Sequence, residues 1–253
     1  MPALAGQRVV VTRAVNQAEE LAEPLRERGA QVILLPTIAI VSPSDPAPLR
    51  EAAAHCDAYD WILFSSANAV AAFAAELRGP RNLRRARIAA IGSATRESAE
   101  KEGFTVSLVP EKFVAESLVE AFASENLYGC RVLIPSSAVT REILPNELRR
   151  RGATVDVVEA YRNIIPPDTA DLATAVFREP YPDWVTFTSS SAVDNLLSVT
   201  VTTMLIEVKI ATIGPVTSDS VRKHGLDVAA EADPHTVSGL VEALCNAPES
   251  RAL

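Results

Sequence analysis

The sequence has few of the residues that build metal sites, disulfides or membrane spans. Its 253 residues include three histidines and three cysteines, and Cys56, Cys130 and Cys245 are far apart with no CxxC pair. An odd number of scattered cysteines is typical of free thiols in a reducing compartment. No apolar run approaches the roughly 18 residues that a membrane span needs, and no signal peptide is evident at the N-terminus. We therefore expect a cytoplasmic protein without a bound metal.

An excess of positive charge is also missing. The chain has 24 Lys and Arg residues against 32 Asp and Glu, which gives a net charge of −8. Because nucleic-acid binders and polybasic membrane contacts need a basic surface, this balance argues against both partners. An anionic substrate would have to be held by local donors rather than by the field of the whole protein.

Common catalytic motifs are absent. The sequence has no GxGxxG, no P-loop and no GxSxG, and it shows no serine triad or nucleophilic cysteine. His55, His224 and His235 are scattered without metal-ligand spacing, and His224 is expected at a helix end. An enzyme of this sequence would rely on binding geometry and on a few hydroxyl groups.

What the sequence does contain is an internal repeat of about half the chain. Eight residues within 19–32 recur at an offset of 123 positions, and Trp61 recurs as Trp184. Further along, Ile-Gly at 91–92 recurs at 213–214, so one deletion has changed the offset to 122. Chance does not easily hold so many identities in register. The chain therefore consists of two copies of one unit.

Each copy alternates short apolar strands with helices. In the first copy we expect strands at 8–12, 31–40, 61–64, 87–92 and 105–110, and helices at 16–28, 69–77, 97–102 and 116–122. The second copy has strands RVLIP, VDVVEAY, WVTFT, KIATIG and DVAAEA in the same order. This alternation predicts parallel sheets covered by helices on both faces. Five strands per unit suit an α/β, doubly wound, flavodoxin-like sheet.

Proline-rich stretches follow the second strand of each copy, IVSPSDPAP in one and NIIPPDTAD in the other. Such stretches are typical of linkers, and the alternative is that they are only loops. If they are linkers, residues 41–161 form one domain, and residues 1–37 and 165–253 together form the other. Each domain then takes two strands from one copy and three from the other.

Small polar residues follow the strands at their carboxyl ends, where parallel α/β sheets bind ligands. They are Ser65, Ser66, Asn68, Thr95, Ser136, Ser189, Ser190, Ser191 and Thr217. Exposed N–H groups at a helix start suit a carboxylate or a phosphate. Each residue alone is better explained as a helix N-cap. Their number favours a binding cleft, which these loops would line if the two domains face each other.

Tyr161 and Arg13 also stand at strand ends. Tyr161 ends the strand VDVVEAYR just before Pro166 and Pro167. Its phenol either packs as a ring or donates a proton to a leaving group. Arg13 is either a solvated cation or a bidentate carboxylate anchor. The basic run at 81–87 is more typical of a solvated loop, although it could supply positive potential locally.

Taken together, these motifs resemble the uroporphyrinogen-III synthase family over residues 8–244. The likeness is carried by VVVTR, YDWILFSSANAV, the paired turns RIAAIGSAT and KIATIGPVT, and REILPNELRRRGATVDVVEAYR. No single motif is diagnostic, but their order and the swapped double repeat make the match specific. The resemblance implies two domains joined by a two-stranded connector, here residues 38–40 and 162–164.

The resemblance also implies an activity. The family is a group of cyclising hydro-lyases of haem biosynthesis, expected to act here as a monomer with no cofactor and no metal. The family substrate is hydroxymethylbilane, a linear tetrapyrrole that carries carboxylates on every ring. The enzyme removes the terminal hydroxyl as water and closes the ring with inversion of ring D.

Site roles follow from the resemblance by position. Tyr161 matches the family tyrosine that assists departure of the hydroxyl. Thr95 and Thr217 match the threonines of the paired IGxxT turns, which face the cleft. Ser66 and Ser190 lie in loops whose backbone amides would hold the acetate and propionate arms.

One position departs from the family pattern. Many relatives carry arginine where this chain has Ser136. One expected cation is therefore missing, which puts one specific carboxylate contact in doubt.

Two other classes of function remain open on the residues alone. A non-catalytic small-molecule carrier or sensor would share the cleft and the strand-end donors, but it would tolerate Tyr161→Phe. A two-domain carbohydrate-transfer enzyme would usually need a phosphate-gripping glycine loop and acidic or histidine catalytic groups, and neither is evident.

Overall fold

The fold consists of two compact units built from interleaved parts of the chain. The computed structural model describes residues 2–77, 83, 85–110, 121–122, 125–137 and 143–247. Unit 1 comprises Met1–Ala39 and Ile164–Leu253, and unit 2 comprises Ile40–Asn163. The chain therefore passes from one unit to the other twice.

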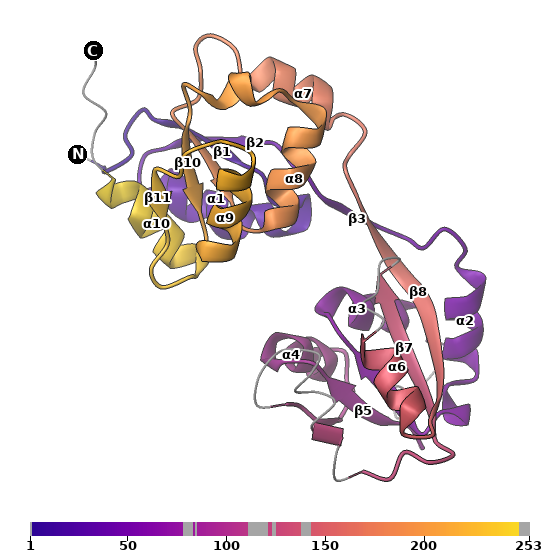
Figure 1. The fold of residues 1–253 in the computed structure, drawn as a ribbon. Coiled ribbons are helices and arrows are strands. Elements are labelled where there is room, and N and C mark those ends of the chain that lie inside the picture. Colours follow the sequence, from indigo (N-terminus) through magenta and orange to yellow (C-terminus); the bar gives the residue numbers. More distant parts are fainter. Residues whose placement is uncertain are drawn as a thin grey trace. The chain divides into compact units, whose positions relative to one another are not determined.

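Unit 1 contains a five-stranded parallel sheet in the order β11-β10-β9-β1-β2 (Figure 1). Its strands are β1 (Arg8–Val11), β2 (Gln31–Leu34), β9 (Trp184–Phe187), β10 (Lys209–Thr212) and β11 (Ala230–Glu231). Its helices are α1 (Val15–Glu27), α7 (Thr169–Val176), α8 (Ser190–Val199), α9 (Pro215–Lys223) and α10 (Val237–Asn246), with a 3-10 turn at Thr202–Leu205.

Helices cover both faces of the unit 1 sheet. Val9 and Val11 of β1 pack with α1 and α10 on one face. Val10, between them, packs with α7, α8 and α9 on the other face. Successive side chains of a strand point to opposite faces, so a run of three valines is buried on both sides.

Unit 2 contains a six-stranded sheet in the order β3-β8-β7-β4-β5-β6. Figure 1 labels β3, β5, β7 and β8 of this sheet. Its strands are β3 (Ala39–Val41), β4 (Trp61–Phe64), β5 (Arg87–Ala90), β6 (Val106–Leu108), β7 (Arg131–Ser137) and β8 (Thr154–Ile164). Strands β8, β7, β4, β5 and β6 pair in parallel. The helices are α2 (Ala47–Ala54), α3 (Ala67–Glu76), α4 (Ser93–Lys101) and α6 (Ile143–Arg150), with a 3-10 turn at Cys56–Ala58.

The unit 2 sheet is also covered on both faces. Ile62 and Phe64 of β4 pack with α2 and α3, and Trp61 and Leu63 pack with α6. The predicted α/β class with two parallel-strand layers is confirmed.

The two sheets exchange strands between the copies of the repeat. Unit 1 takes β1 and β2 from the first copy and β9, β10 and β11 from the second, whereas unit 2 takes β7 and β8 from the second copy and β4, β5 and β6 from the first. Numbered within a copy, the unit 1 sheet reads 2-1-3-4-5, which is the flavodoxin-like order, and the unit 2 sheet reads the same with β3 added at the edge beside β8. The predicted strand-swapped repeat is therefore confirmed.

One predicted strand is wrong. The run at 31–40 was expected to form a single strand, but it divides into β2 in unit 1 and β3 in unit 2. The backbone follows β1 as far as Thr37, whose N–H donates to Thr12 O at 3.1 Å. Beyond that point β1 has given way to helix α1, so no strand partner remains. The next three strand residues pair in the sheet of unit 2 instead.

The proline-rich stretches lead directly into two helices that the sequence analysis did not predict. Helix α2 begins at Ala47 and α7 at Thr169, each within or at the end of such a stretch. Proline is tolerated in the first turn of a helix, because the N–H groups there have no intrahelical partner. The helix expected at 116–122 lies outside the described residues except at its last two positions. None of the helices in the described ranges is long and apolar enough to cross a membrane.

Candidate functional site

Each unit gathers its predicted site residues at one edge of its sheet. In unit 2 these residues follow β4 and β5 or lie near the carboxyl ends of β7 and β8, and they are Ser65, Ser66, Asn68, Thr95, Ser136 and Tyr161. The prediction that Tyr161 ends its strand is wrong, because β8 continues to Ile164. In unit 1 they follow β1, β9 and β10, and they are Arg13, Ser189, Ser190, Ser191 and Thr217. The carboxyl ends of parallel strands share an edge, which explains both groupings.

Ser66 is the N-cap of helix α3. Its backbone is extended, with φ −161° and ψ 158°, and its Oγ accepts a hydrogen bond from the Ala69 N–H at 3.1 Å. This bond satisfies one of the N–H groups that a helix start leaves unpaired. The N-cap explanation is therefore correct for Ser66, whose side chain is half-buried.

Tyr161 meets Ser66 although 95 positions separate them in the sequence. The Tyr161 Oη lies 3.1 Å from Ser66 Oγ. The approach depends on an irregularity of β8. Ser136 pairs with Glu159 and Ser137 pairs with Tyr161, so Ala160 is an extra residue at this point. Such bulges redirect side chains and are frequent beside active sites.

Glu159, at the start of this bulge, is a residue that the sequence analysis missed. Its two carboxylate oxygens accept hydrogen bonds from Ser44 N at 2.9 Å and Ser44 Oγ at 3.0 Å. Arg162 Nε lies 3.4 Å from the same carboxylate. These contacts tie the chain after β3 to the strand that carries Tyr161. No signal in the sequence links positions 115 residues apart.

Thr95 and Ser136 are more buried than expected for side chains that bind a ligand. Thr95 lies in the first turn of α4 and is 6% exposed, and Ser136 is 4% exposed near the end of β7. In unit 1 the counterpart of Thr95 is Thr217, in the first turn of α9, which is 4% exposed. The backbone N–H of Thr217 also has a partner already, since it donates to Gly214 O at 3.1 Å.

The serines of unit 1 repeat the helix start of unit 2. Ser189 caps α8 with φ −161° and ψ 154°, and its Oγ accepts from the Ala192 N–H at 3.2 Å. Ser190 Oγ donates to Val216 O at 3.1 Å and thereby links the starts of α8 and α9. Ser191 is exposed.

Arg13 lies at the end of β1 with its side chain 12% exposed. Its Nη2 donates to Glu20 Oε2 at 2.9 Å, whereas its Nε and Nη1 are buried and have no hydrogen-bond partner in the described part of the chain. Buried donors without partners are costly, so a ligand that pairs with them gains their full hydrogen-bonding capacity. Nε and Nη1 lie on different sides of the guanidinium, and Nη2 is held by Glu20, so Arg13 offers separate single donors to an anion and not a free parallel pair.

Arginines of the predicted basic run have partners. Within 81–87, residues 81, 82 and 84 lie outside the described ranges. Arg85 Nη2 lies 2.9 Å from Asp60 Oδ1, and Arg87 Nη1 lies 2.7 Å from Glu125 Oε2. These ion pairs weaken the local positive potential that the run was expected to supply.

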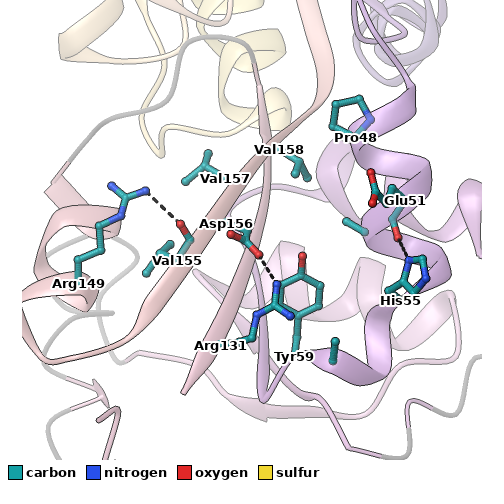
Figure 2. Close-up of a pocket in the computed structure, with 12 residues that line it drawn as sticks. Pro48, Glu51, His55, Tyr59, Arg131, Arg149, Val155, Asp156, Val157 and Val158 are labelled. Carbon is teal, nitrogen blue, oxygen red and sulfur yellow. Dashed lines mark hydrogen bonds and ion pairs between the residues drawn. The ribbon is translucent and has the colours of Figure 1, made fainter. Parts of the chain in front are cut away.

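A pocket of about 730 Å³ lies elsewhere in unit 2, between α2 and the first half of β8 (Figure 2). Arg131 pairs with Asp156 at 3.0 Å and lies 5.0 Å from the centre of the Tyr59 ring. Burial and the Asp156 carboxylate raise the pKa of Tyr59 to about 12. Arg149 donates to Val155 O at 3.1 Å on the far wall. None of the predicted site residues lines this pocket, which lies toward the amino ends of β7 and β8.

His224 has a partner that the sequence analysis did not foresee. It follows α9 as expected, and its Nε2 lies 2.9 Å from Asp194 Oδ1 on α8. Ser220 Oγ donates to the same oxygen at 2.9 Å. The His224 contact holds the pKa of Asp194 below its usual range. Among the described residues, no three His, Cys, Asp or Glu side chains gather as metal ligands.

The geometry thus provides one phenol held by a serine and several donors suited to carboxylates. Ser66 and Tyr161 are the two predicted residues that the structure joins by a side-chain contact. Arg13 and the helix starts supply donors at the edge of unit 1. In unit 1 such donors can bind an anion, and in unit 2 such a phenol can deliver a proton.

Comparison with known proteins gives a consistent result. A profile of the family "Uroporphyrinogen-III synthase HemD" matches residues 19–242. The chain is 34% identical to uroporphyrinogen-III synthase of Synechococcus elongatus over 95% of each protein. It is 31% identical to a putative uroporphyrinogen-III synthase of Methanothermobacter thermautotrophicus, over 93% of this chain and 96% of that protein.

Solved structures share the fold. The structure of a mutant uroporphyrinogen III synthase from the extremely thermophilic bacterium Thermus thermophilus matches with a TM-score of 0.64 and 19% identity, over 94% of this chain and 96% of that one. The structure of uroporphyrinogen-III synthetase from Helicobacter pylori matches with a TM-score of 0.62 and 17% identity, over 93% of this chain and 97% of that one.

Proposed function

Because the chain belongs to the uroporphyrinogen-III synthase family, we propose that it cyclises hydroxymethylbilane to uroporphyrinogen III in haem biosynthesis. The observation that carries the proposal is the family match over residues 19–242, which spans strands of both units. The reaction is a lyase reaction in which water leaves, ring D is inverted and the macrocycle closes. Loss of water and ring closure transfer no electrons, so the chemistry calls for no redox cofactor.

We propose that the substrate carboxylates bind the donors at the carboxyl edges of the sheets. The starts of α3 and α8 carry the positive end of a helix dipole, which favours an anion. Arg13 brings two buried, unpaired guanidinium donors. This assignment covers Arg13, Ser65, Ser66, Asn68, Thr95, Ser136, Ser189, Ser190, Ser191 and Thr217. It is supported by the position of these residues at the two sheet edges.

Tyr161 is the proposed catalytic residue. It is the general acid that protonates the hydroxyl group as it leaves. The proposal is supported by its place at the strand-end edge and by its hydroxyl contact with Ser66. General acid catalysis contributes roughly 10²- to 10⁴-fold to a rate.

Orientation supplies the rest of the catalysis. The cation left by hydroxyl loss closes the ring readily by itself, so the protein must favour the inverted closure over the direct one. Binding the carboxylates at fixed donors restricts how the linear chain folds, and such restriction can be worth several powers of ten in rate.

Location and assembly belong to the same proposal. Cys56, Cys130 and Cys245 are free in the structure, as is usual in a reducing compartment. We therefore place the protein in the cytoplasm, acting as a monomer on a small-molecule tetrapyrrole.

Product analysis tests the function. Fresh hydroxymethylbilane is incubated with and without the purified protein, and the oxidised porphyrins are separated by isomer. We expect the spontaneous type I isomer without protein and type III with it, with no cofactor added. Type I product alone from folded protein would overturn the proposal and favour a carrier.

Tyr161→Phe tests the catalytic role. We expect kcat to fall roughly 100-fold, because the proton donor is removed while the ring remains. Tyr181→Phe is the matched control, since Tyr181 is a 42% exposed tyrosine of unit 1 outside the proposed site. Its kcat should equal that of the wild type. If Tyr161→Phe turns over at the wild-type rate, Tyr161 is not the general acid.

A further inference from the structure

We propose that Ser66 is a positioning residue whose hydroxyl donates a hydrogen bond to Tyr161 and thereby readies the phenol to give up its proton. The inference rests on the proposed function and deepens it. It assigns the Ser66 side chain to the tyrosine, while the Ser66 backbone stays with the substrate.

The position of Tyr161 is set by two features of unit 2. At a regular strand position, Ala160 and Tyr161 would point to opposite faces. The extra residue in β8 changes this, and both side chains contact the same core cluster around Phe64 and Phe73. The ring is therefore anchored in the core of unit 2 while its hydroxyl reaches the start of α3. Backbone and core fix the ring, and Ser66 fixes the oxygen.

The capping contact leaves the Ser66 proton available for the hydrogen bond to Tyr161, in which either hydroxyl can donate. A hydroxyl has one proton and two lone pairs. One lone pair of Ser66 Oγ already accepts the Ala69 N–H at 3.1 Å. The proton is free to point at Tyr161 Oη, 3.1 Å away. When Ser66 donates, the proton of Tyr161 is left available for the substrate.

The bond strengthens as the reaction proceeds. Tyr161 transfers its phenolic proton to the leaving oxygen, and the carbon–oxygen bond breaks with its electron pair going to that oxygen. Water leaves, and a cationic substrate faces a phenolate. Ser66 then donates to a full negative charge close to a helix N-terminus, where negative charge is favoured. Ring closure releases a proton from the substrate, and the phenolate takes it back.

The repeat provides a natural comparison. Ser189 caps α8 with the same geometry as Ser66 caps α3. The residue that corresponds to Tyr161 at an offset of 123 is Ile38, a partly buried side chain in a core cluster of unit 1. The cap is thus present twice and the phenol once. Ser189 therefore caps a helix without a phenol at the position that corresponds to Tyr161, whereas Ser66 caps a helix beside the phenol of Tyr161.

A double-mutant cycle tests the inference. Ser66→Ala is made in the wild type and in Tyr161→Phe, and kcat and KM are measured with hydroxymethylbilane. In the wild type we expect kcat to fall roughly 10- to 100-fold with little change in KM, since a hydrogen bond to a developing charge is lost. In Tyr161→Phe the same change should alter kcat less than about threefold, because the partner is already gone.

Three further variants separate positioning from folding and binding. Ser66→Thr keeps both cap and hydroxyl and should restore kcat to within about threefold. Ser66→Asp keeps the cap but has no proton to donate, so it should melt like the wild type and still lose kcat. Ser189→Ala should change kcat by the same factor in the wild type and in Tyr161→Phe.

The outcomes are distinct. Equal losses from Ser66→Ala in both backgrounds, or full activity of Ser66→Asp, would overturn the positioning role while leaving the proposed function intact. A wild-type protein that forms no type III product would overturn the proposed function and this inference with it.

Discussion

The two units are built to one plan, and they differ where the proposed chemistry lies. Ser66 and Ser189 make the same cap, with hydroxyl-to-amide distances of 3.1 and 3.2 Å. Yet Tyr161 in unit 2 corresponds to Ile38 in unit 1, and Arg13 in unit 1 corresponds to Ser136 in unit 2. The strand-to-helix junctions are thus duplicated, whereas the phenol and the buried cation each occur once. The shared caps are explained by folding, because each satisfies an N–H group at a helix start. Tyr161 and Arg13, which are not shared, are the residues with proposed functional roles.

A hydrogen bond from a backbone N–H to an aspartate carboxylate connects the two copies of the repeat in each unit. Arg131 N donates to Asp60 Oδ2 at 2.9 Å in unit 2, and Arg8 N donates to Asp183 Oδ2 at 2.7 Å in unit 1. Each pair joins one residue of the first copy to one of the second. The same contact is therefore made twice with the copies reversed, which is what a reciprocal exchange of strands requires.

The largest expected effect comes from the paired tryptophans. Trp61 and Trp184 are each 2% exposed in the core of their own unit. Replacing either with alanine should lower the free energy of unfolding of that unit by about 3–5 kcal/mol, through lost burial and an unfilled cavity. No described core cluster draws residues from both units, so the effect should stay within one of them.

The chain has only two tryptophans, which makes this test sharp. In Trp61→Ala the remaining tryptophan reports on unit 1, and in Trp184→Ala it reports on unit 2. Urea unfolding followed by the fluorescence of the remaining tryptophan should have the same midpoint as in the corresponding Trp→Phe variant. Circular dichroism should show the unit that carries the Trp→Ala change unfolding at a lower urea concentration. A shift of both signals together would mean that the units unfold as one.

A smaller effect is expected at the glycines that end α1 and α6. Gly29 has φ +88° and Gly152 has φ +90°, a region that costs other residues about 1–2 kcal/mol. A Cβ at Gly29 would lie 2.9 Å from Pro2 Cβ and 3.1 Å from the Ala5 backbone, whereas at Gly152 it would lie 2.8 Å from the Tyr128 ring and 3.2 Å from the Tyr128 Cα.

The neighbours decide which of these glycines matters more. The Tyr128 side chain is 83% exposed and can move aside. Gly29→Ala should therefore destabilise by about 2–3 kcal/mol and Gly152→Ala by about 1–2 kcal/mol, measured by urea unfolding. Gly225→Ala is the control for strain alone, because its φ is +75° and no atom lies within 4 Å. Equal losses at all three positions would show that crowding has no part.

Much of the fold follows from the sequence because the repeat is visible in it. The identities that recur in register, such as Glu19 and Glu142, indicate two copies of one unit. The division of residues 31–40 between two sheets was not predictable, since β2 and β3 form one apolar run in the sequence. Only the end of β1 at Val11 determines where that run must change partners.

The site was predictable in part for a similar reason. Parallel strands place their carboxyl ends together, so Ser66 and Tyr161 could be assigned to one edge. Their contact could not, because it depends on a bulge at Ala160 that VDVVEAYR does not signal. The anchoring of that bulge by Ser44 and Glu159 likewise joins positions that no local pattern connects.

The smallest expected effect concerns the hydrogen bond from the Arg131 N–H to Asp60, which has a counterpart from the Arg8 N–H to Asp183. The backbone N–H of Arg131 is the main cause that holds the pKa of Asp60 below its ordinary value of 3.8, and the Arg85 side chain adds to it. A carboxyl whose pKa is lowered on folding stabilises the protein above its unfolded pKa and loses this contribution as pH falls through the lower folded pKa. The contribution should therefore be complete at pH 7 and should fade below about pH 4.

Asp60→Asn keeps an oxygen that can accept the Arg131 N–H and removes only the charge. At pH 7 it should lower the free energy of unfolding by about 1 kcal/mol, since the side chain is partly solvated. At pH 3 the difference in the free energy of unfolding between Asp60→Asn and the wild type should be smaller. Asp183→Asn makes the same change at the hydrogen bond from the Arg8 N–H, and urea unfolding at both pH values compares the two. A difference for Asp60→Asn that is as large at pH 3 as at pH 7 would mean that this contact within unit 2 stabilises through its shape and not through its charge.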